Sequence, residues 1–341
     1  MKILILGNNG FLGRQITSYF HNKKYNKYNI STESESNFEI IGIDRTNNNS
    51  VQSCNFGNFY DYNILDLKCH DKILEVLLEK KPDIIINLMA QMFPTNGNEL
   101  YYTNPKIALN ICSILKKYLS CSNEKLSFLH VGSAAEYGTK DSEQSITEKD
   151  DTTPTSAYGE TKLLQTLIFN EFAKSISNCN HLQQKISIKI ARVFNIVNKD
   201  MTEDFFFPLI VGKFLSLNNQ SNQPEITVRS LYQTRDYLHT TDVIPALEAI
   251  IFKGKHGEIY NVSSSIGITA KNAIDYLQKK FHLHRLDIID ESSGVINFSI
   301  GNNQKLKEIY DLKITKNYID ILDELIEAKK EKREKEIETI L

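Results

Sequence analysis

The chain has 341 residues, of which 41% are hydrophobic, and its formal net charge is −2 with an isoelectric point near 6.5. This length can bury a large core, and the nearly balanced charge gives no reason to expect binding to nucleic acid or to a membrane. No apolar stretch is long enough to span a membrane and the five cysteines include no CxxC pair, so we expect a cytoplasmic protein without a metal site.

The N-terminus has the pattern of a nucleotide-binding turn. Residues 2–6 (KILIL) are an apolar run that predicts a buried strand, and an amphipathic helix pattern follows the glycines at positions 7, 10 and 13. Gly7 permits a tight turn, Gly10 lets the backbone approach a pyrophosphate at the helix N-terminus, and Gly13 allows close packing of helix on strand. The predicted dinucleotide site therefore comprises these glycines together with Asn9, Phe11 and Leu12.

A second predicted strand, residues 38–43, ends at Asp44 and Arg45. An acidic residue at this point can bind the adenosine ribose hydroxyls of NAD and would repel the 2′-phosphate of NADP. Arg45 either pairs with such a phosphate or is simply solvated, so we expect NAD and leave NADP possible. The polar stretch 22–37, which separates the glycine turn from this strand, is interpreted as a surface insertion.

Strand and helix patterns alternate through the first two-thirds of the chain. Helical patterns at 71–80, 105–119 and 157–175 each precede an apolar strand pattern, at 83–88, 126–131 and 186–193 respectively. This alternation predicts an α/β fold with a doubly wound parallel sheet, in which ligands gather at the carboxyl ends of the strands. After residue 195 the pattern becomes irregular and predicts a smaller lobe, and residues 321–341 predict a charged C-terminal helix.

Tyr158 and Lys162 are candidates for acid–base chemistry. Their spacing of four places both side chains on one helix face, one turn apart. Because a nearby ammonium favours the phenolate, we expect Tyr158 to have a lowered pKa and to exchange a proton with a hydroxyl or ketone near neutral pH. Ser133 comes after a predicted strand, where its hydroxyl can bond the reacting oxygen. Taken singly, the pair also suits an ordinary exposed helix face, and Ser133 suits a turn.

Other motifs appear in a fixed order along the chain. They are Asp66-Leu67, the turn 87–90 (NLMA), Asn104, the run 131–138 (VGSAAEYG), the run 191–195 (ARVFN) and the run 235–237 (RDY). With the glycine turn and the YxxxK pair, this series resembles the extended short-chain dehydrogenase/reductase family, the NAD-dependent epimerase/dehydratase group that acts on nucleotide sugars. The resemblance spans about residues 1–315, and the order of the motifs is more specific than any one of them.

The resemblance implies a division of the chain and a set of cofactor contacts. Residues 1–195 would form an NAD(P)-binding Rossmann-type domain that carries the catalytic residues, and residues 196–320 would form mainly a C-terminal substrate-binding lobe. Asp66 and Leu67 would contact the adenine ring. The remaining implied cofactor contacts are Leu88, Met89 and Ala90 along the cofactor, Asn104 in support of the active site, and the pair Tyr158 and Lys162.

The resemblance also implies the catalytic and substrate residues. Catalysis would fall to Ser133, Tyr158 and Lys162, and Arg235 would grip the diphosphate of a nucleotide sugar. The other implied substrate contacts are Ser133, Ala134, Tyr158 and Asn195. Read from the residues alone, Arg235 equally suits a salt bridge with Asp236. The segment 291–295 lacks the arginine that completes the clamp in many members, so the nucleotide and the sugar stay open.

The residues directly after Ser133 narrow the choice of reaction. Dehydratases of the family carry an Asp-Glu pair after the catalytic Thr, whereas this chain has Ala134 and Ala135. Glu136 is expected to point away, since neighbouring strand residues alternate faces. We therefore favour a 4-keto reductase, resembling the GDP-4-keto-6-deoxymannose reductase branch, with a nucleotide-sugar 4-epimerase as the alternative. A non-catalytic cofactor-sensing regulator is disfavoured because Ser133, Tyr158 and Lys162 are all retained.

The two longest predicted helices suggest self-association. Helices 105–119 and 157–175 carry apolar residues beyond one face, among them Ile111, Ile114, Leu115, Leu163, Leu164, Leu167 and Ile168. Family members commonly pair these helices across a dimer, which requires a second apolar face. The resemblance therefore implies a homodimer, and deeper burial within one monomer is the alternative.

Overall fold

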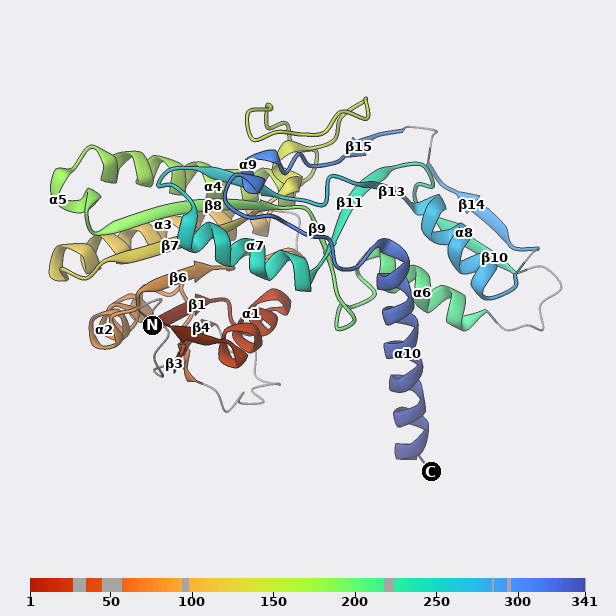
Figure 1. The fold of residues 1–341 in the computed structure, drawn as a ribbon, viewed down its shortest axis with the longest axis horizontal. Coiled ribbons are helices and arrows are strands. Elements are labelled where there is room, and N and C mark those ends of the chain that lie inside the picture. The colour runs from red at the N-terminus through yellow and green to blue at the C-terminus, as the bar shows by residue number, and fades with distance from the viewer. Residues whose placement is uncertain are drawn as a thin grey trace.

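A seven-stranded parallel sheet organises the N-terminal part of the protein (Figure 1). The computed structural model describes residues 1–26, 35–44, 57–93, 98–217, 224–283, 285–292 and 296–340, so Arg45 lies outside the described residues. The strand order is β12-β8-β7-β6-β1-β4-β5. The bounds are β1 Lys2–Leu6, β4 Glu39–Asp44, β5 Asn58–Asp61, β6 Ile84–Asn87, β7 Leu126–Ser133, β8 Ile186–Val193 and β12 Ile259–Val262. The predicted doubly wound fold is confirmed, and the order reverses between β1 and β6, where such sheets bind ligands.

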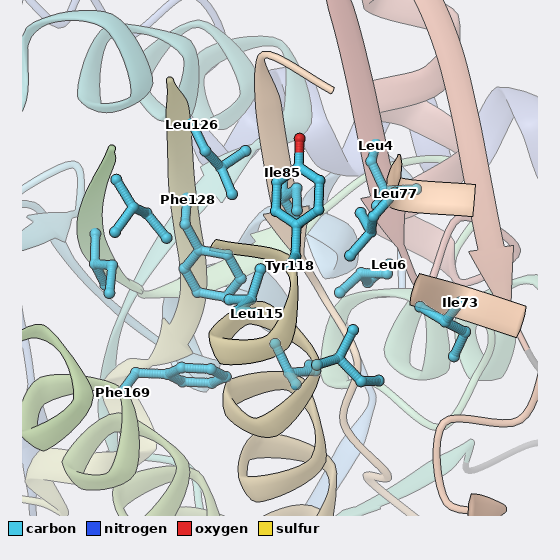
Figure 2. Packing of buried hydrophobic residues seen from close by; sticks show 14 of the residues in the cluster. Leu4, Leu6, Ile73, Leu77, Ile85, Leu115, Tyr118, Leu126, Phe128 and Phe169 are labelled. Carbon is cyan, nitrogen blue, oxygen red and sulfur yellow. The ribbon is translucent and has the colours of Figure 1, made fainter. Parts of the chain in front are cut away.

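Helices cover both faces of this sheet, because successive strand residues point to opposite sides. Leu4 and Leu6 of β1 pack with α2 (His70–Lys80), α3 (Glu99–Cys121) and α4 (Ala157–Ser177). Figure 2 shows this layer, in which Tyr118, Leu115 and Phe169 from the helices meet Ile85, Leu126 and Phe128 from the strands.

The other side of β1 builds the second helical layer. Ile3 and Ile5 pack with α1 (Phe11–Asn22) and α7 (Thr240–Lys253). Continuous apolar strands such as Ile84-Ile85-Ile86 therefore serve both layers at once, as expected for a parallel sheet that is buried on both faces.

A second, smaller core lies in the C-terminal part. Its elements are α6 (Phe206–Ser216), β10 (Glu225–Val228), α8 (Ala270–Lys280), β14 (Asp287–Asp290) and α10 (Tyr318–Ile340). The first turns of α10 bury Ile321, Leu322, Leu325 and Ile326 in this core, while its C-terminal end extends away from the body of the molecule (Figure 1). A small sheet of β9 (Asn195–Val197), β11 (Thr234–His239), β13 (Gly267–Thr269) and β15 (Phe298–Ser299) accompanies it.

Two local features differ from the sequence expectations. Helix α3 begins at Glu99 and not at 105, with Pro105 inside it, because Leu100 and Asn104 are held by tertiary packing and hydrogen bonds that offset the missing backbone donor. Within the stretch 22–37, α1 ends at Asn22, and β2 (Lys24–Asn26) pairs with β3 (Glu35–Asn37) in antiparallel fashion.

In the part of the chain that the structure describes, no helix has the length and apolarity of a membrane span.

Candidate active site

Close contact between the end of β7 and the first turn of α4 brings the predicted catalytic residues together. Ser133 is the last residue of β7, and Tyr158 lies in the first turn of α4, whose start is capped by the Ser156 hydroxyl accepting from the Gly159 N–H at 3.1 Å. A Cβ at Gly159 would overlap the Ala135 carbonyl oxygen. A glycine is therefore required here for α4 to approach the chain that continues from Ser133.

Tyr158 lies beside the side chain of Ser133. Burial of the phenol raises the pKa of Tyr158 to about 12; the Ser133 side chain opposes this shift and the charge of Glu136 adds to it. The lowered pKa predicted from a neighbouring ammonium is therefore wrong for this structure. The pKa is raised because the phenol loses its hydration on burial, and this effect is stronger than that of any nearby charge. Tyr158 is accordingly a protonated acid at neutral pH.

Lys162 is buried beneath the same helix turn. Its Nζ donates to the Val131 carbonyl oxygen at 2.9 Å and to Gln165 Oε1 at 2.8 Å. Burial lowers the pKa of Lys162 to about 8, and the charge of Glu136 opposes this shift. The ammonium group is thus anchored on β7 and α4 and lies in a pH range where it can titrate.

Glu136 is oriented by a 3₁₀ turn, η2 (Ala134–Tyr137), and not by a continuing strand. The prediction from strand alternation therefore started from the wrong backbone geometry. The buried Glu136 carboxylate accepts from the Ser133 N–H at 2.8 Å and pairs with Arg192 Nε at 2.7 Å. Arg192 also lies over the Tyr137 ring, 4.5 Å from its centroid. This buried ion pair fixes the backbone of Ser133 from the interior side.

The glycine turn has the geometry expected for phosphate contact. Gly7 has φ +88° and donates its N–H to the Ile43 carbonyl at 2.9 Å. A Cβ at Gly13 would overlap the Gly7 carbonyl oxygen, so α1 packs tightly on the turn. Gly10 is the N-cap of α1 and offers no side chain to the first amides of the helix. The Asn9 N–H donates to Asp44 Oδ2 at 2.9 Å, which brings the second-strand acid to this turn.

The segment after β6 forms the neighbouring wall. A Cβ at Gly7 would lie 3.3 Å from the Leu88 carbonyl carbon and from the Met89 nitrogen, and Ala90 comes next. Asn104 Oδ1 accepts from the Gln91 N–H at 2.7 Å, and its Nδ2 donates to the Gln91 carbonyl at 2.9 Å and to Thr161 Oγ1 at 3.0 Å. Asn104 therefore ties this wall to α4, which supports a positioning role.

The predicted adenine contacts follow β5, the edge strand that is separated from β1 by β4. Asp66 caps the short 3₁₀ helix η1 (Leu67–Cys69) by accepting from the Lys68 N–H at 2.9 Å. The Leu67 side chain is 69% exposed. Phe11 and Leu12, the first residues of α1, are partly buried. An exposed leucine beside a fixed acid offers an apolar surface to a flat ring, as the resemblance implies.

Asn195 and Arg235 form a second group on the strands β9 and β11. The exposed Asn195 donates from Nδ2 to the Asp236 carbonyl at 2.8 Å. Arg235 donates to Asn297 Oδ1 and to Gln233 Oε1, both at 2.9 Å. Asp236 is buried and accepts from Ser264, Ser265 and Gly301. Within the described ranges no ion pair joins Asp236 to Arg235, so the guanidinium meets only neutral partners.

Reasoning from the sequence missed two residues at this site. Gln165, which contacts Lys162, was not singled out, although its spacing of three from Lys162 places both on one helix face. The pairing of Glu136 with Arg192 joins residues 56 positions apart, and no local pattern reveals such a contact. Among the described residues, no group of three or more His, Cys, Asp or Glu side chains is arranged to hold a metal ion.

The fold and site define an NAD-binding member of a known enzyme class. Residues 3–263 match the model of the NAD dependent epimerase/dehydratase family, and the chain belongs to that family. The expected cofactor is NAD, with NADP possible, and the positive φ of Gly7, the uncapped N-terminus of α1 and the position of Asp44 all fit such a dinucleotide.

Three known proteins illustrate the range of the family. A dTDP-D-glucose 4,6-dehydratase of Dictyostelium discoideum is 28% identical over 290 residues, covering 79% of this chain and 59% of that protein. A GDP-6-deoxy-D-talose 4-dehydrogenase of Aggregatibacter actinomycetemcomitans is 24% identical over 299 residues, covering 84% and 82%. The crystal structure of a Bacillus anthracis dTDP-glucose 4,6-dehydratase in complex with NAD superposes with a TM-score of 0.76 at 20% identity, covering 98% of each chain.

We predict that alanine at Gly13 and at Gly10 will have different effects. Gly13→Ala forces a Cβ onto the Gly7 carbonyl and should lower both the melting temperature and the affinity for NAD. A Cβ at Gly10 would lie 3.3 Å from the same oxygen, so Gly10→Ala should fold nearly normally and lose chiefly cofactor affinity. Thermal unfolding and NADH fluorescence titration measure the two effects. Equal melting temperatures for wild type and Gly13→Ala would contradict the packing argument.

Proposed function

We propose that the protein reduces the 4-keto group of a nucleotide-linked 4-keto-6-deoxyhexose. When bound, NADH supplies the hydride for such a reduction. The chain's own part is to supply a proton to the developing alkoxide and to hold the sugar. The observation that carries the proposal is the placement of a protonated Tyr158 beside Ser133 at the carboxyl end of β7. Similarity to a 4-dehydrogenase of a GDP-6-deoxyhexose supports the same class of substrate.

The roles of the two residues follow from their chemistry. Tyr158, with its pKa raised to about 12, keeps its proton until the sugar oxygen becomes basic enough to take it. Ser133, whose backbone is fixed by Glu136, orients the same oxygen through its hydroxyl. Lys162, one turn further along α4, would favour the phenolate left behind through its positive charge.

Elimination of water, the step that defines a dehydratase, is disfavoured by the surroundings of Ser133. Ala134 and Ala135 have no proton to exchange. Glu136, the next carboxylate, is buried and committed to Arg192 and to the Ser133 N–H. Removing Glu136 from these partners to act as a base would leave Arg192 buried and unpaired, which costs several kcal/mol, on the order of 3–5.

We propose that Asn195 and Arg235 bind the nucleotide-sugar diphosphate. The Arg235 guanidinium has neutral partners, Asn297 and Gln233, so an incoming phosphate would meet an uncompensated positive charge. Burial lowers the pKa of Arg235, but an arginine remains charged throughout the physiological range. Ala134, the implied sugar contact directly after Ser133, is buried in a cluster with Tyr137, Ile146 and Phe194.

A panel experiment tests the reaction. The protein is incubated with GDP-, dTDP- and UDP-linked 4-keto-6-deoxyhexoses and hexoses, with NADH or NADPH, and products are identified by mass spectrometry and NMR. We expect one NADH consumed per sugar reduced, and weaker use of NADPH because Asp44 repels a 2′-phosphate. Inversion at C4 without net cofactor consumption would instead establish an epimerase. Cofactor binding without turnover of any sugar would favour a sensing role.

Tyr158→Phe should reduce kcat by about 10²–10⁴-fold, because it removes only the proton donor. NADH affinity and melting temperature should change little. In the wild type, kcat/KM should not fall through ionisation of Tyr158 below pH 10, since its pKa is raised to about 12. A decrease centred near pH 8 should follow loss of the proton from Lys162. Full activity in Tyr158→Phe would contradict the catalytic assignment.

We also propose a homodimer, through only some of the residues first considered, Leu164 and Leu167, together with Leu109. Ile111, Ile114 and Leu115 are buried in the monomer core and cannot form an interface. Helices α3 and α4 instead expose Leu109, Leu164 and Leu167, at 56%, 40% and 47%. Apolar side chains exposed together on two adjacent helices suit contact with the same face of a second copy.

Leu167→Glu should therefore convert a dimer into a monomer, because it places a charge on this surface. Leu209→Glu, at an exposed leucine of α6, is the matched control and should leave the dimer intact. Light scattering at micromolar concentration measures both. A wild-type protein that is monomeric at micromolar concentration would contradict the proposal.

A further inference from the structure

Gln165 lies between Lys162 and the wall formed by the segment after β6. We propose that Gln165 is a positioning residue that aims the Lys162 ammonium group at the cofactor and joins it to the cofactor-binding turn at Met89. This inference deepens the proposed function and rests on Lys162 being one of the cofactor contacts that the family resemblance implies. It assigns to a buried amide, three residues beyond the YxxxK pair, a part in cofactor binding.

The orientation of the Gln165 amide is determined by its partners. Its Nε2 donates to two backbone carbonyl oxygens, those of Met89 at 3.2 Å and Asn104 at 2.9 Å. Because a carbonyl can only accept, the NH₂ group must face these oxygens and Oε1 must face Lys162. Oε1 accepts from Lys162 Nζ at 2.8 Å. Both amide hydrogens and the amide oxygen are thus used, and Gln165 is fully buried.

This arrangement directs the remaining donor of Lys162. An ammonium group has three N–H donors in tetrahedral geometry. Val131 and Gln165 are the two acceptors of Lys162 within the described residues, so together they set the direction of the third N–H. Loss of Gln165 would leave the group held at Val131 alone and free to rotate about that contact.

The same amide joins Lys162 to the glycine turn. Met89, whose carbonyl it binds, has its nitrogen 3.3 Å from the place of a Cβ on Gly7. Independently of Gln165, Asn104 joins the segment after β6 to α4, because it accepts from the Gln91 N–H and donates to Thr161 Oγ1. Replacing Gln165 should therefore leave this wall attached to α4, so the variant is expected to fold.

The charged surroundings of Lys162 set the direction of the expected pH effects. Glu136 from η2 stabilises its protonated form, and His130 from β7, whose pKa burial and Lys162 keep well below its usual value, is neutral. From α4 itself, Tyr158 lies one turn before Lys162 and is protonated at neutral pH. The segment after β6 and α3 contribute the carbonyls of Met89 and Asn104 through Gln165. Removing the Oε1 acceptor should lower the pKa of Lys162, whereas a carboxylate there should raise it.

The test is NADH titration by fluorescence between pH 6 and 10, which requires no sugar. Wild-type affinity should fall as Lys162 loses its proton, around pH 8. Gln165→Met, similar in volume, should bind NADH about tenfold more weakly and lose affinity at a lower pH. Gln165→Glu should lose affinity at a higher pH than wild type. Thr166→Val is the matched control: its buried hydroxyl has no hydrogen-bond partner among the described residues, and its pH profile should equal that of wild type.

The outcomes separate this inference from the reaction proposed above. Unchanged pH profiles in both Gln165 variants would overturn the positioning role, even if the sugar panel yields a reductase. If Gln165→Met fails to fold, Gln165→Glu alone decides by the direction of its shift. Opposite shifts in the two variants would support the role, even if no sugar in the panel is reduced.

Discussion

The candidate site depends on one close approach of backbone to backbone. The first turn of α4 lies against η2, and only a glycine at position 159 leaves room for the Ala135 carbonyl. This contact places Tyr158 beside Ser133 although the two belong to elements separated by a long loop. A side chain at position 159 would push α4 outward and separate the hydroxyls of Tyr158 and Ser133. The placement of these two hydroxyls therefore depends on backbone packing.

Beneath this contact the site is built on buried charge. Glu136 and Arg192 are both buried, and Lys162 is buried with neutral acceptors. Such groups contribute little net stability, because desolvation offsets most of the attraction between them. What they provide is orientation: Glu136 holds the Ser133 N–H, and the cost of burying Lys162 moves its pKa to about 8. The low dielectric that raises the pKa of Tyr158 also strengthens each of these contacts.

Much of the fold was predictable because local sequence patterns determine it. The strands 2–6 and 186–193 have the predicted bounds, since apolar runs flanked by polar residues have few alternatives in an α/β chain. The start of α3 and the 3₁₀ turn after Ser133 were not predicted, because tertiary contacts of Asn104 and Glu136 decide them. The prediction for the pKa of Tyr158 failed for a related reason. The sequence indicates which charges are near the phenol, but not how much water the fold removes from around it.

Buried charge also joins the C-terminal lobe to the rest of the protein, away from the candidate catalytic residues. Asp236 accepts from Ser264, Ser265 and Gly301, and so joins β11 to two later segments of the chain. Burial outweighs these donors and raises the pKa of Asp236 to about 6. A carboxyl group with a raised pKa stabilises the fold most when protonated, and this contribution is lost as the pH rises through 6. At neutral pH the ionised group is therefore kept at a cost in stability. The Asp236 carboxylate fixes β11, which carries Arg235 and the Asp236 carbonyl that Asn195 binds. Asp236 therefore positions both residues proposed to hold the diphosphate without contacting the diphosphate itself.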